Sequence, residues 1–293
     1  MQYFDYAAPQ SLGEALSLMA SAGENGRVLA GGTDLIVMMR AGRRRPTFVL
    51  DGKQVPELQE LSLNGGLTLG AAVSCRRIWE NSDVSRAFPA LIDSASIIGG
   101  VQIQGRASVG GNLCNAAPSA DCIPTLIALG ATCSIASSSG NREVAAEDFC
   151  VAPGQTVLRP GEILVNMKIP AQSPNSGAAY LRFTPRNEMD IAIAGVGASV
   201  VLEADRETIK SARIALSAVG PTPIFASDAG QLLAGKSASD ESALMAAAEA
   251  AREASRPITD MRGTIDQRKH LVGVLTVRAL KKAIERAKGS NNG

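Results

Sequence analysis

The stretch GRVLAGGTDLIVMMRAG, residues 26–42, places two glycines between a short apolar run and a longer one. The first run predicts a β-strand, and DLIVMMRAG predicts a short helix that ends near Gly42. Because Gly31 and Gly32 can adopt positive φ, several backbone N–H groups can converge where the strand passes into the helix. Such a point can bind a phosphate, although paired glycines before a helix also form simple turns. The spacing matches neither GxGxxG nor a P-loop.

The residues around this stretch predict a small βαβ lobe over about residues 1–55. A strand at 2–9 is followed by a helix at 11–23, for which Ser11 is the expected N-cap and Glu14 lies at the position of a capping box. The strand of the glycine stretch comes next, and a further strand is expected at 47–52.

The sequence pattern changes over residues 56–171, where short apolar runs alternate with Gly, Asn and Ser. This pattern predicts a larger lobe built on a mostly antiparallel sheet, with helical segments at 74–98 and 121–130. Pro170 and the following AQSPNSGA break regular structure, so we expect domains at 1–171 and 172–289. In the second domain, strands at 178–186, 192–205 and 208–220 precede helices at 226–235, 240–255 and 276–289. The fold class is therefore α+β.

Composition excludes several classes of protein. Lys plus Arg number 29 against 28 Asp plus Glu, which gives no electrostatic reason to expect nucleic acid or an anionic membrane as a partner. No basic leader and no apolar run of about 18 residues occurs, so we expect no membrane span and a cytoplasmic protein. Five cysteines without a CxxC pair are expected to be mostly buried, reduced thiols. His270 is the only histidine, and we expect no metal in this chain.

A second glycine pair occurs in GRASVGGNLCNAAPSAD, residues 105–121. Ser108 and Asn112 can supply side-chain hydrogen bonds to phosphate or sugar oxygens, and Asp121 can accept a hydrogen bond from a sugar-type hydroxyl. The glycines allow close approach of the backbone to a ligand. Two such pairs in one domain favour a dinucleotide cofactor over two unrelated turns.

Together these segments carry a family resemblance. VLAGGTDL (28–35), VQIQGRASVGGNLCNAAPSADCIPTLIALGA (101–131), PGEILVNMKIP (160–170) and FTPRNEMDIAIAGVGASV (183–200) resemble the FAD-binding medium subunit of the molybdenum hydroxylases, the family of carbon monoxide dehydrogenase and xanthine dehydrogenase. The resemblance covers nearly the whole chain. It implies a two-lobed FAD-binding domain of the vanillyl-alcohol-oxidase (PCMH) type, followed by a C-terminal α+β flavoprotein domain.

The resemblance also implies roles for particular residues. Two loops would wrap the FAD diphosphate, Asp121 would hydrogen-bond the cofactor, Leu164 would be an apolar flavin contact, and Arg182 would lie near the isoalloxazine. Arg182, Asp190 and Ile191 are the residues expected to tune the flavin, because a cation stabilises the charge that a reduced flavin gains. The implied cofactor-binding residues are Val28, Leu29, Ala30, Gly31, Gly32, Thr33, Asp34, Leu35, Ile98, Gly99, Ser108, Val109, Gly110, Gly111, Asn112, Asp121, Leu164 and Arg182.

Other interpretations of the same residues stay open. Arg182 can instead be a solvated arginine paired with Glu188 or Asp190, and Asp121 can cap the helix that follows it. RAGRRRP (40–46) is either a solvated face or a surface that docks an iron–sulfur subunit. The second loop reads QIQGRASVGGN where the family pattern resembles QIRNRGTIGGN, which leaves the roles of Gln104 and Gly105 in doubt. The cysteines lack the inserted loop with which some members bind an extra [4Fe-4S] cluster.

The function implied is that of an oxidoreductase subunit. Beside a small subunit with two [2Fe-2S] clusters and a large molybdopterin subunit, often in a dimer of heterotrimers, its FAD would pass electrons to an external acceptor. One alternative is a stand-alone PCMH-type flavoprotein oxidase or reductase, and another is a nucleotide-binding scaffold without redox function. Neither the substrate nor the acceptor follows from the sequence.

Overall fold

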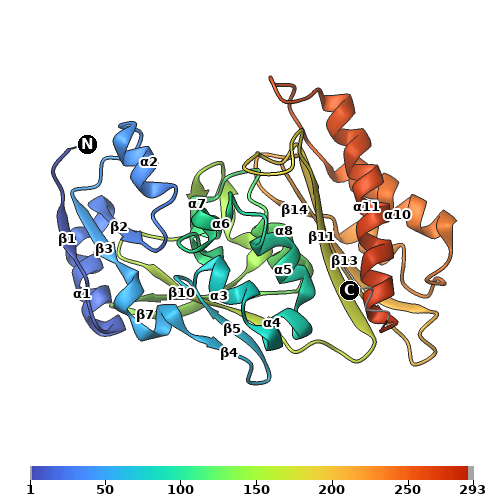
Figure 1. Ribbon diagram of the computed structural model, residues 1–293, viewed down its shortest axis with the longest axis horizontal. Coiled ribbons are helices and arrows are strands. Elements are labelled where there is room, and N and C mark those ends of the chain that lie inside the picture. The colour runs from blue at the N-terminus through green and yellow to red at the C-terminus, as the bar shows by residue number, and fades with distance from the viewer. Residues whose placement is uncertain (1, 290–293) are drawn as a thin grey trace.

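The computed structural model describes residues 2–289 and places three parts in a row: a small lobe, a larger lobe and a C-terminal part (Figure 1). The small lobe contains the predicted βαβ unit, and its three strands form a parallel sheet in the order β1-β3-β2. Ser11 accepts a hydrogen bond from the Glu14 backbone N–H, which starts the first helix at the predicted residue. The lobe comprises β1 (Asp5–Ala7), α1 (Leu12–Ala22), β2 (Gly26–Leu29), α2 (Leu35–Arg40) and β3 (Phe48–Asp51), with 3₁₀ turns at Gly23–Asn25, Gly52–Gln54 and Pro56–Gln59.

The larger lobe contains the predicted antiparallel sheet, in the order β4-β5-β10-β6-β7. Side chains alternate between the buried and exposed faces along the second half of β10, as expected for a sheet covered on one face. The strands are β4 (Leu61–Ser62), β5 (Gly66–Gly70), β6 (Thr132–Ser137), β7 (Gly140–Ala145) and β10 (Ile163–Pro170). A 3₁₀ turn (Ala146–Asp148) precedes a hairpin of β8 (Cys150–Ala152) and β9 (Gln155–Thr156).

The helices of the larger lobe differ in part from the prediction. Residues 74–98 form three helices, α3 (Cys75–Trp79), α4 (Ser82–Ala87) and α5 (Pro89–Ala95). The breaks have local causes, because the Asn81 side chain caps α4 and Pro89 begins α5. Two short helices, α6 (Val101–Gln104) and α7 (Val109–Asn115), were not predicted, since glycines disfavour a helix. Helix α8 (Cys122–Ala128) was predicted.

The C-terminal part is an antiparallel sheet in strand order β11-β12-β13-β14, with helices after it. Helices α10 and α11 lie on its outer side, whereas α5 and α8 of the larger lobe contact the strands from the other part of the molecule (Figure 1). The elements are β11 (Ser176–Phe183), β12 (Ala194–Leu202), β13 (Ile209–Ser217), β14 (Ile224–Phe225), α9 (Ser227–Gln231), α10 (Glu241–Ala254) and α11 (Ile265–Ala287). The last helix begins about a dozen residues earlier than predicted, at a cap formed by Thr264.

The contact between the larger lobe and the C-terminal part is both apolar and ionic. All seven residues of α8 are buried, and a side chain at Gly197 of β12 would lie 2.5 Å from the Pro124 carbonyl oxygen. At the edge of this contact, the Asp93 carboxylate on α5 accepts hydrogen bonds from Arg286 at 2.6 Å and from Lys282 at 3.0 Å, both on α11. Asp93 also accepts from the backbone N–H of Tyr180 at 3.1 Å. A single carboxylate thus connects three elements.

Candidate cofactor-binding site

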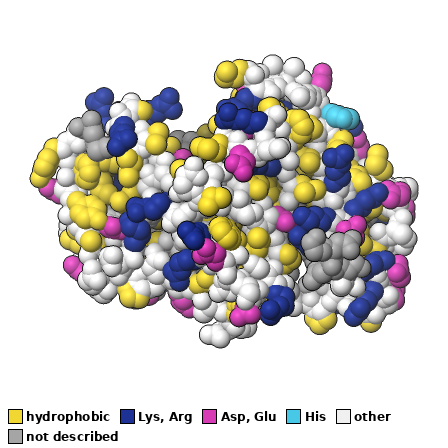
Figure 2. Space-filling view, in the orientation of Figure 1, with side chains coloured by type: hydrophobic (Ala, Val, Ile, Leu, Met, Phe, Trp, Pro, Cys, Tyr) yellow, Lys and Arg dark blue, Asp and Glu magenta, His cyan; other side chains and the backbone are white. Residues whose placement is uncertain are grey.

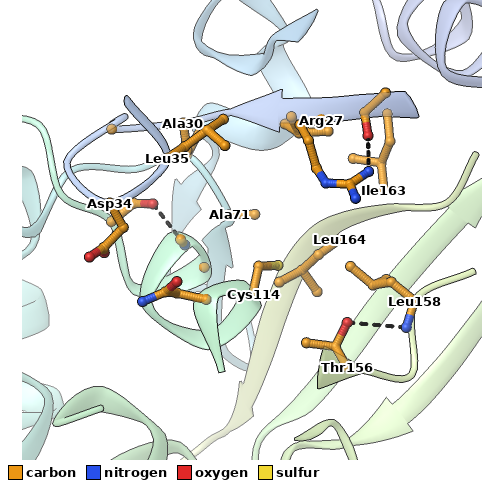
Figure 3. Close-up of a pocket in the computed structure, with 18 of the residues that line it drawn as sticks. Arg27, Ala30, Asp34, Leu35, Ala71, Cys114, Thr156, Leu158, Ile163 and Leu164 are labelled. Carbon is orange, nitrogen blue, oxygen red and sulfur yellow. Dashed lines mark hydrogen bonds between the residues drawn. The ribbon is translucent and has the colours of Figure 1, made fainter. Parts of the chain in front are cut away.

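A cavity of about 630 Å³ lies between the two lobes of residues 2–170, and part of its lining is shown in Figure 3. This volume is within the range of sites that bind cofactors and drug-sized ligands. The cavity brings together residues from both glycine stretches and from β10. Of the residues that the resemblance implied, those that line it are Val28, Ala30, Gly31, Gly32, Thr33, Asp34, Leu35, Ile98, Ser108, Gly110, Gly111, Asn112 and Leu164.

The first glycine stretch is held from outside the cavity by two cations. Lys53 Nζ donates to the Ala30 carbonyl at 3.3 Å, and Arg106 Nε donates to the Gly31 carbonyl at 3.4 Å. Lys53 is itself held by Asp51, to which it is 2.6 Å away. In a trans peptide the N–H points opposite to the carbonyl, so the N–H groups of Gly31 and Gly32 point away from these cations.

The two glycines of this stretch are needed for different reasons. Gly32 has φ +77°, a conformation that glycine adopts without strain. A Cβ at Gly31 would overlap the backbone carbonyl of Arg106, so this glycine allows the two lobes to approach each other. Among the described residues, the N–H groups of residues 32–35 donate no hydrogen bond to protein atoms. They are therefore available to a ligand.

The glycine pair of the second stretch, Gly110 and Gly111, lies in the first turn of α7 rather than in a loop. Ser108 Oγ accepts a hydrogen bond from the Gly111 N–H at 3.0 Å and caps the helix. A Cβ at Gly110 would lie 2.5 Å from the backbone of Ala71, whereas a Cβ at Gly111 would meet only Ser108 Oγ, at 3.0 Å. Gly110 thus serves packing, and Gly111 leaves space in the cavity. Asn112 Oδ1 accepts from the Cys122 N–H at 3.2 Å, which orients the side chain.

Other implied residues lie outside this lining, namely Leu29, Gly99, Val109, Asp121, Arg182, Asp190 and Ile191. Arg182 Nη1 forms an ion pair with Asp121 Oδ2 at 2.6 Å, and both side chains are less than a tenth exposed. Arg182 Nη2 also donates to the Ile97 carbonyl, next to the cavity residue Ile98. The Tyr180 hydroxyl donates to Asp121 Oδ1 at 2.7 Å. Burial raises the pKa of the Asp121 carboxyl above its usual value, and the opposing effects of Arg182 and Tyr180 cancel only part of that rise.

Two of the alternative interpretations are wrong. Arg182 pairs with Asp121 rather than with Glu188 or Asp190, and Asp190 instead forms an ion pair with Arg262 at 3.0 Å. The Asp121 side chain makes no capping hydrogen bond to α8, because both of its oxygens accept from Tyr180 and Arg182. The signal for this pair was present in the sequence only as two isolated charges 61 residues apart.

Sequence reasoning missed several lining residues. Arg27 directly precedes VLAGGTDL (28–35), and Arg159 directly precedes PGEIL (160–164), so both cations are adjacent to motifs that the sequence analysis had identified. Arg44 of the arginine run 43–45 also lines the cavity. The apolar or uncharged lining that was missed includes Met19, Met38, Leu58, Cys114, Gly154, Gln155, Thr156 and Leu158.

The cysteines follow the expectation in part. Cys75, Cys122 and Cys133 are buried free thiols, and burial raises the pKa of Cys75 and of Cys133 to about 12. Cys114 is exposed, because it lies on the cavity side of α7, and Cys150 is half-buried. Within residues 2–289 no group of three or more His, Cys, Asp or Glu side chains is placed to hold a metal ion. No helix in that range is long and apolar enough to cross a membrane.

Comparison with known proteins matches both parts of this chain. Residues 2–172 match the family described as "FAD binding domain in molybdopterin dehydrogenase", and residues 179–283 match "CO dehydrogenase flavoprotein C-terminal domain". The carbon monoxide dehydrogenase medium chain of Hydrogenophaga pseudoflava is 31% identical over 281 residues, 96% of each chain. The xanthine dehydrogenase FAD-binding subunit of Escherichia coli O157:H7 is 32% identical over 293 residues, 98% of this chain and 99% of the relative.

Solved structures agree. A chain of reconstituted CO dehydrogenase from Oligotropha carboxidovorans superposes with a TM-score of 0.92 at 29% identity, covering 97% of this chain and 99% of that one. A chain of quinoline 2-oxidoreductase from Pseudomonas putida 86 gives a TM-score of 0.89 at 32% identity, covering 98% and 100%. The cavity with its two glycine stretches lies within the matched FAD-binding domain. The chain therefore belongs to the FAD-binding medium subunits of the molybdenum hydroxylases, a family of oxidoreductase complexes.

Proposed function

We propose that this chain is the electron-transfer subunit through which a molybdenum hydroxylase delivers its electrons to an external acceptor. In this proposal FAD receives electrons from the [2Fe-2S] clusters of a small subunit, which in turn serves a large subunit with the molybdenum cofactor. The three subunits would form a dimer of heterotrimers in the cytoplasm. The observation that carries the proposal is a cavity lined by both glycine stretches, in which the N–H groups of residues 32–35 have no protein partner among the described residues.

The residues of the cavity divide the work of holding FAD. Residues 28–35 and 108–112 would bind the diphosphate, because backbone N–H groups and the Asn112 amide donate hydrogen bonds to phosphate oxygens. Ile98 and Leu164 would contact the apolar face of a ring. When bound, FAD supplies the ability to accept and release electrons one or two at a time. The protein contributes position, hydrogen bonds and exclusion of water.

Arg182, Asp190 and Ile191 remain the residues proposed to tune the flavin. Since Asp121 balances the charge of Arg182, we expect Arg182 to act through a directed N–H group rather than as a free cation. The hydrogen bond from Arg182 to the Ile97 carbonyl supports this role, because Ile97 directly precedes the pair Ile98 and Gly99, which the resemblance places at the cofactor.

A stand-alone oxidase is the alternative, and the structure offers little for it. Such an enzyme needs a group that removes a proton from its own substrate beside the flavin. His270 is exposed on α11 and does not line the cavity. No other observation favours independent catalysis over electron transfer.

Purification of the native complex tests the proposal. We expect one FAD for each copy of this chain, with iron and molybdenum in the copurified subunits, and flavin bleaching when the substrate of the large subunit is added without acceptor. The control is the isolated chain loaded with FAD, which should not bleach with that substrate. Bleaching of the isolated chain would establish the stand-alone alternative, and a complex without flavin would refute the proposal.

A further inference from the structure

A second hollow, of about 240 Å³, lies on the small lobe outside the cofactor cavity. Its lining includes Gln2, Arg40, Arg44 and Arg45, and no Asp or Glu is among the described residues that line it. Arg44 lines both spaces, so this arginine hollow directly adjoins the cofactor cavity. Figure 2 shows positively charged side chains gathered over the small lobe, at the end where Figure 1 places α2.

The arginines of this surface have no carboxylate partner in the part of the chain that the structure describes. Arg40 and the arginines at 43–45 are all exposed, and within residues 2–289 none of them forms an ion pair. The exposed Arg76, by contrast, lies 2.6 Å from the carboxylate of Glu80. Residues 40–45 therefore carry positive charge that a partner can balance.

The backbone that carries these arginines is held in place. Gly42 has φ +68° just after α2, so the chain turns back over the last turn of the helix. The Arg43 N–H donates to the Met38 carbonyl at 2.9 Å, and the Gln2 side-chain amide donates to the Arg45 carbonyl at 3.2 Å. Arg45 Nε also donates to the Gly42 carbonyl at 3.3 Å. Cations on such a fixed turn lose less conformational entropy on binding than cations on a mobile loop.

The composition of the surface fits a protein segment better than a small anion. A guanidinium can bind a carboxylate through two parallel N–H···O bonds, but a single exposed ion pair contributes little to binding. Val37 lies one turn before Arg40 on the same face of α2 and is 62% exposed. A segment with several carboxylates and an apolar side chain can contact the arginines and Val37 together, and arginine is enriched at protein interfaces.

The position of the hollow selects the partner. In the proposed function, electrons reach FAD from the iron–sulfur subunit, so that subunit must lie against the surface next to the cofactor cavity. Arg44 connects the hollow to this cavity, because its side chain lines both. Its Nη2 donates to the Gly154 carbonyl at 3.0 Å, in the turn between β8 and β9 of the larger lobe. A partner seated on the hollow therefore lies beside the place where both lobes meet the cofactor.

We propose that the arginine hollow is the place where an acidic segment of the iron–sulfur subunit docks on this chain. The inference rests on the proposed function. The occupant is a stretch of Asp and Glu side chains, whose carboxylates pair with Arg40, Arg43 and Arg45. These pairs steer the two subunits together and set the side from which the partner approaches the cofactor cavity. Association of the subunits then weakens as ionic strength rises.

The test measures binding of the purified iron–sulfur subunit to the full-length, FAD-loaded chain at low and high salt. R40E/R45E reverses two charges and R40Q/R45Q removes them, and neither arginine lines the cofactor cavity. R278E is the matched control, because Arg278 is exposed on α11 and forms no ion pair within the described residues. We expect R40Q/R45Q to weaken binding about 10-fold at low salt and R40E/R45E about 100-fold, with smaller effects at high salt. R278E should match the wild type, and every variant should retain FAD.

Three results would overturn the inference: binding by R40E/R45E equal to the wild type at low salt, an equal loss in R278E, or an equal loss of binding to the large subunit, titrated separately. Urea unfolding and flavin content control for folding, and R40Q/R45Q keeps the test valid if the charge-reversed variant is unstable. A wild-type chain that does not bind FAD or the iron–sulfur subunit would instead refute the proposed function. A wild type that binds both, with an R40E/R45E variant that binds equally well, refutes only the role of the arginine hollow.

Discussion

Substitution of Gly111 by alanine is expected to separate ligand binding from folding. An added Cβ would meet only Ser108 Oγ, at 3.0 Å, so the hydroxyl must shift by a few tenths of an ångström. Replacing a helical glycine gains up to about 1 kcal/mol, which offsets that shift. The matched control is Gly110→Ala, whose Cβ would lie 2.5 Å from the backbone of Ala71. Overpacking of this kind costs about 1–3 kcal/mol.

The two variants should therefore fail in opposite ways. G111A should unfold within about 1 kcal/mol of the wild type, yet bind FAD about 10- to 100-fold more weakly, because the methyl group displaces the diphosphate from one charge-assisted hydrogen bond. G110A should lose stability before any ligand is added. Urea unfolding of the flavin-free proteins and FAD titration by fluorescence give both numbers. Unchanged FAD affinity in a well-folded G111A would refute the placement of the diphosphate beside α7.

Three further predictions concern the ionic contacts. Asp93→Asn should lower the free energy of unfolding in urea by about 2–4 kcal/mol, somewhat less than the loss of a fully buried pair because Asp93 and Arg286 are 14% and 18% exposed. Adding Arg286→Met to this variant should lower it little further. Full additivity of the two substitutions would contradict the coupling. Burial raises the pKa of Asp93, but Arg286, the Tyr180 N–H and Lys282 together hold the pKa below its usual value. The contribution of Asp93 to stability is therefore complete above about pH 4 and disappears as pH falls through the folded-state pKa. If stability falls with acid in Asp93→Asn as it does in the wild type, this explanation is wrong. Arg182→Met should lower the free energy of unfolding by about 3–5 kcal/mol, because it leaves the Asp121 carboxylate buried without its cation. Adding Asp121→Asn to the same chain should recover part of that loss. A double variant as unstable as Arg182→Met alone would argue against the ion pair.

Local signals in the sequence predicted most of the elements. The Ser11 cap, the apolar runs of the larger lobe and the glycines between β2 and α2 each depend on neighbours in the chain, so the βαβ lobe and the antiparallel sheet are both confirmed. Helix α7 was not predicted, because the local signal of its two glycines is unfavourable for a helix. The need for Gly110 becomes clear only from its close contact with Ala71.

Contacts between distant segments could not be predicted in this way. The approach of Gly31 to the Arg106 backbone spans 75 residues, and Arg44 reaches a carbonyl 110 residues away. The sequence indicated that glycines matter, but their separate roles follow only from the packed structure. The pairing of Arg182 with Asp121 likewise depends on how β11 passes α8.

Burial of the whole of α8 limits how this protein can be divided. One hydrophobic core contains Ile123, Leu126 and Ile127 together with Ala178 and Ala215 from β11 and β13. A fragment that ends at residue 172 would keep the cofactor cavity but expose part of this core to water. We expect such a fragment to aggregate unless the exposed leucine and isoleucines are replaced by polar residues, so the cofactor-binding lobes and the C-terminal sheet should fold and unfold as one unit.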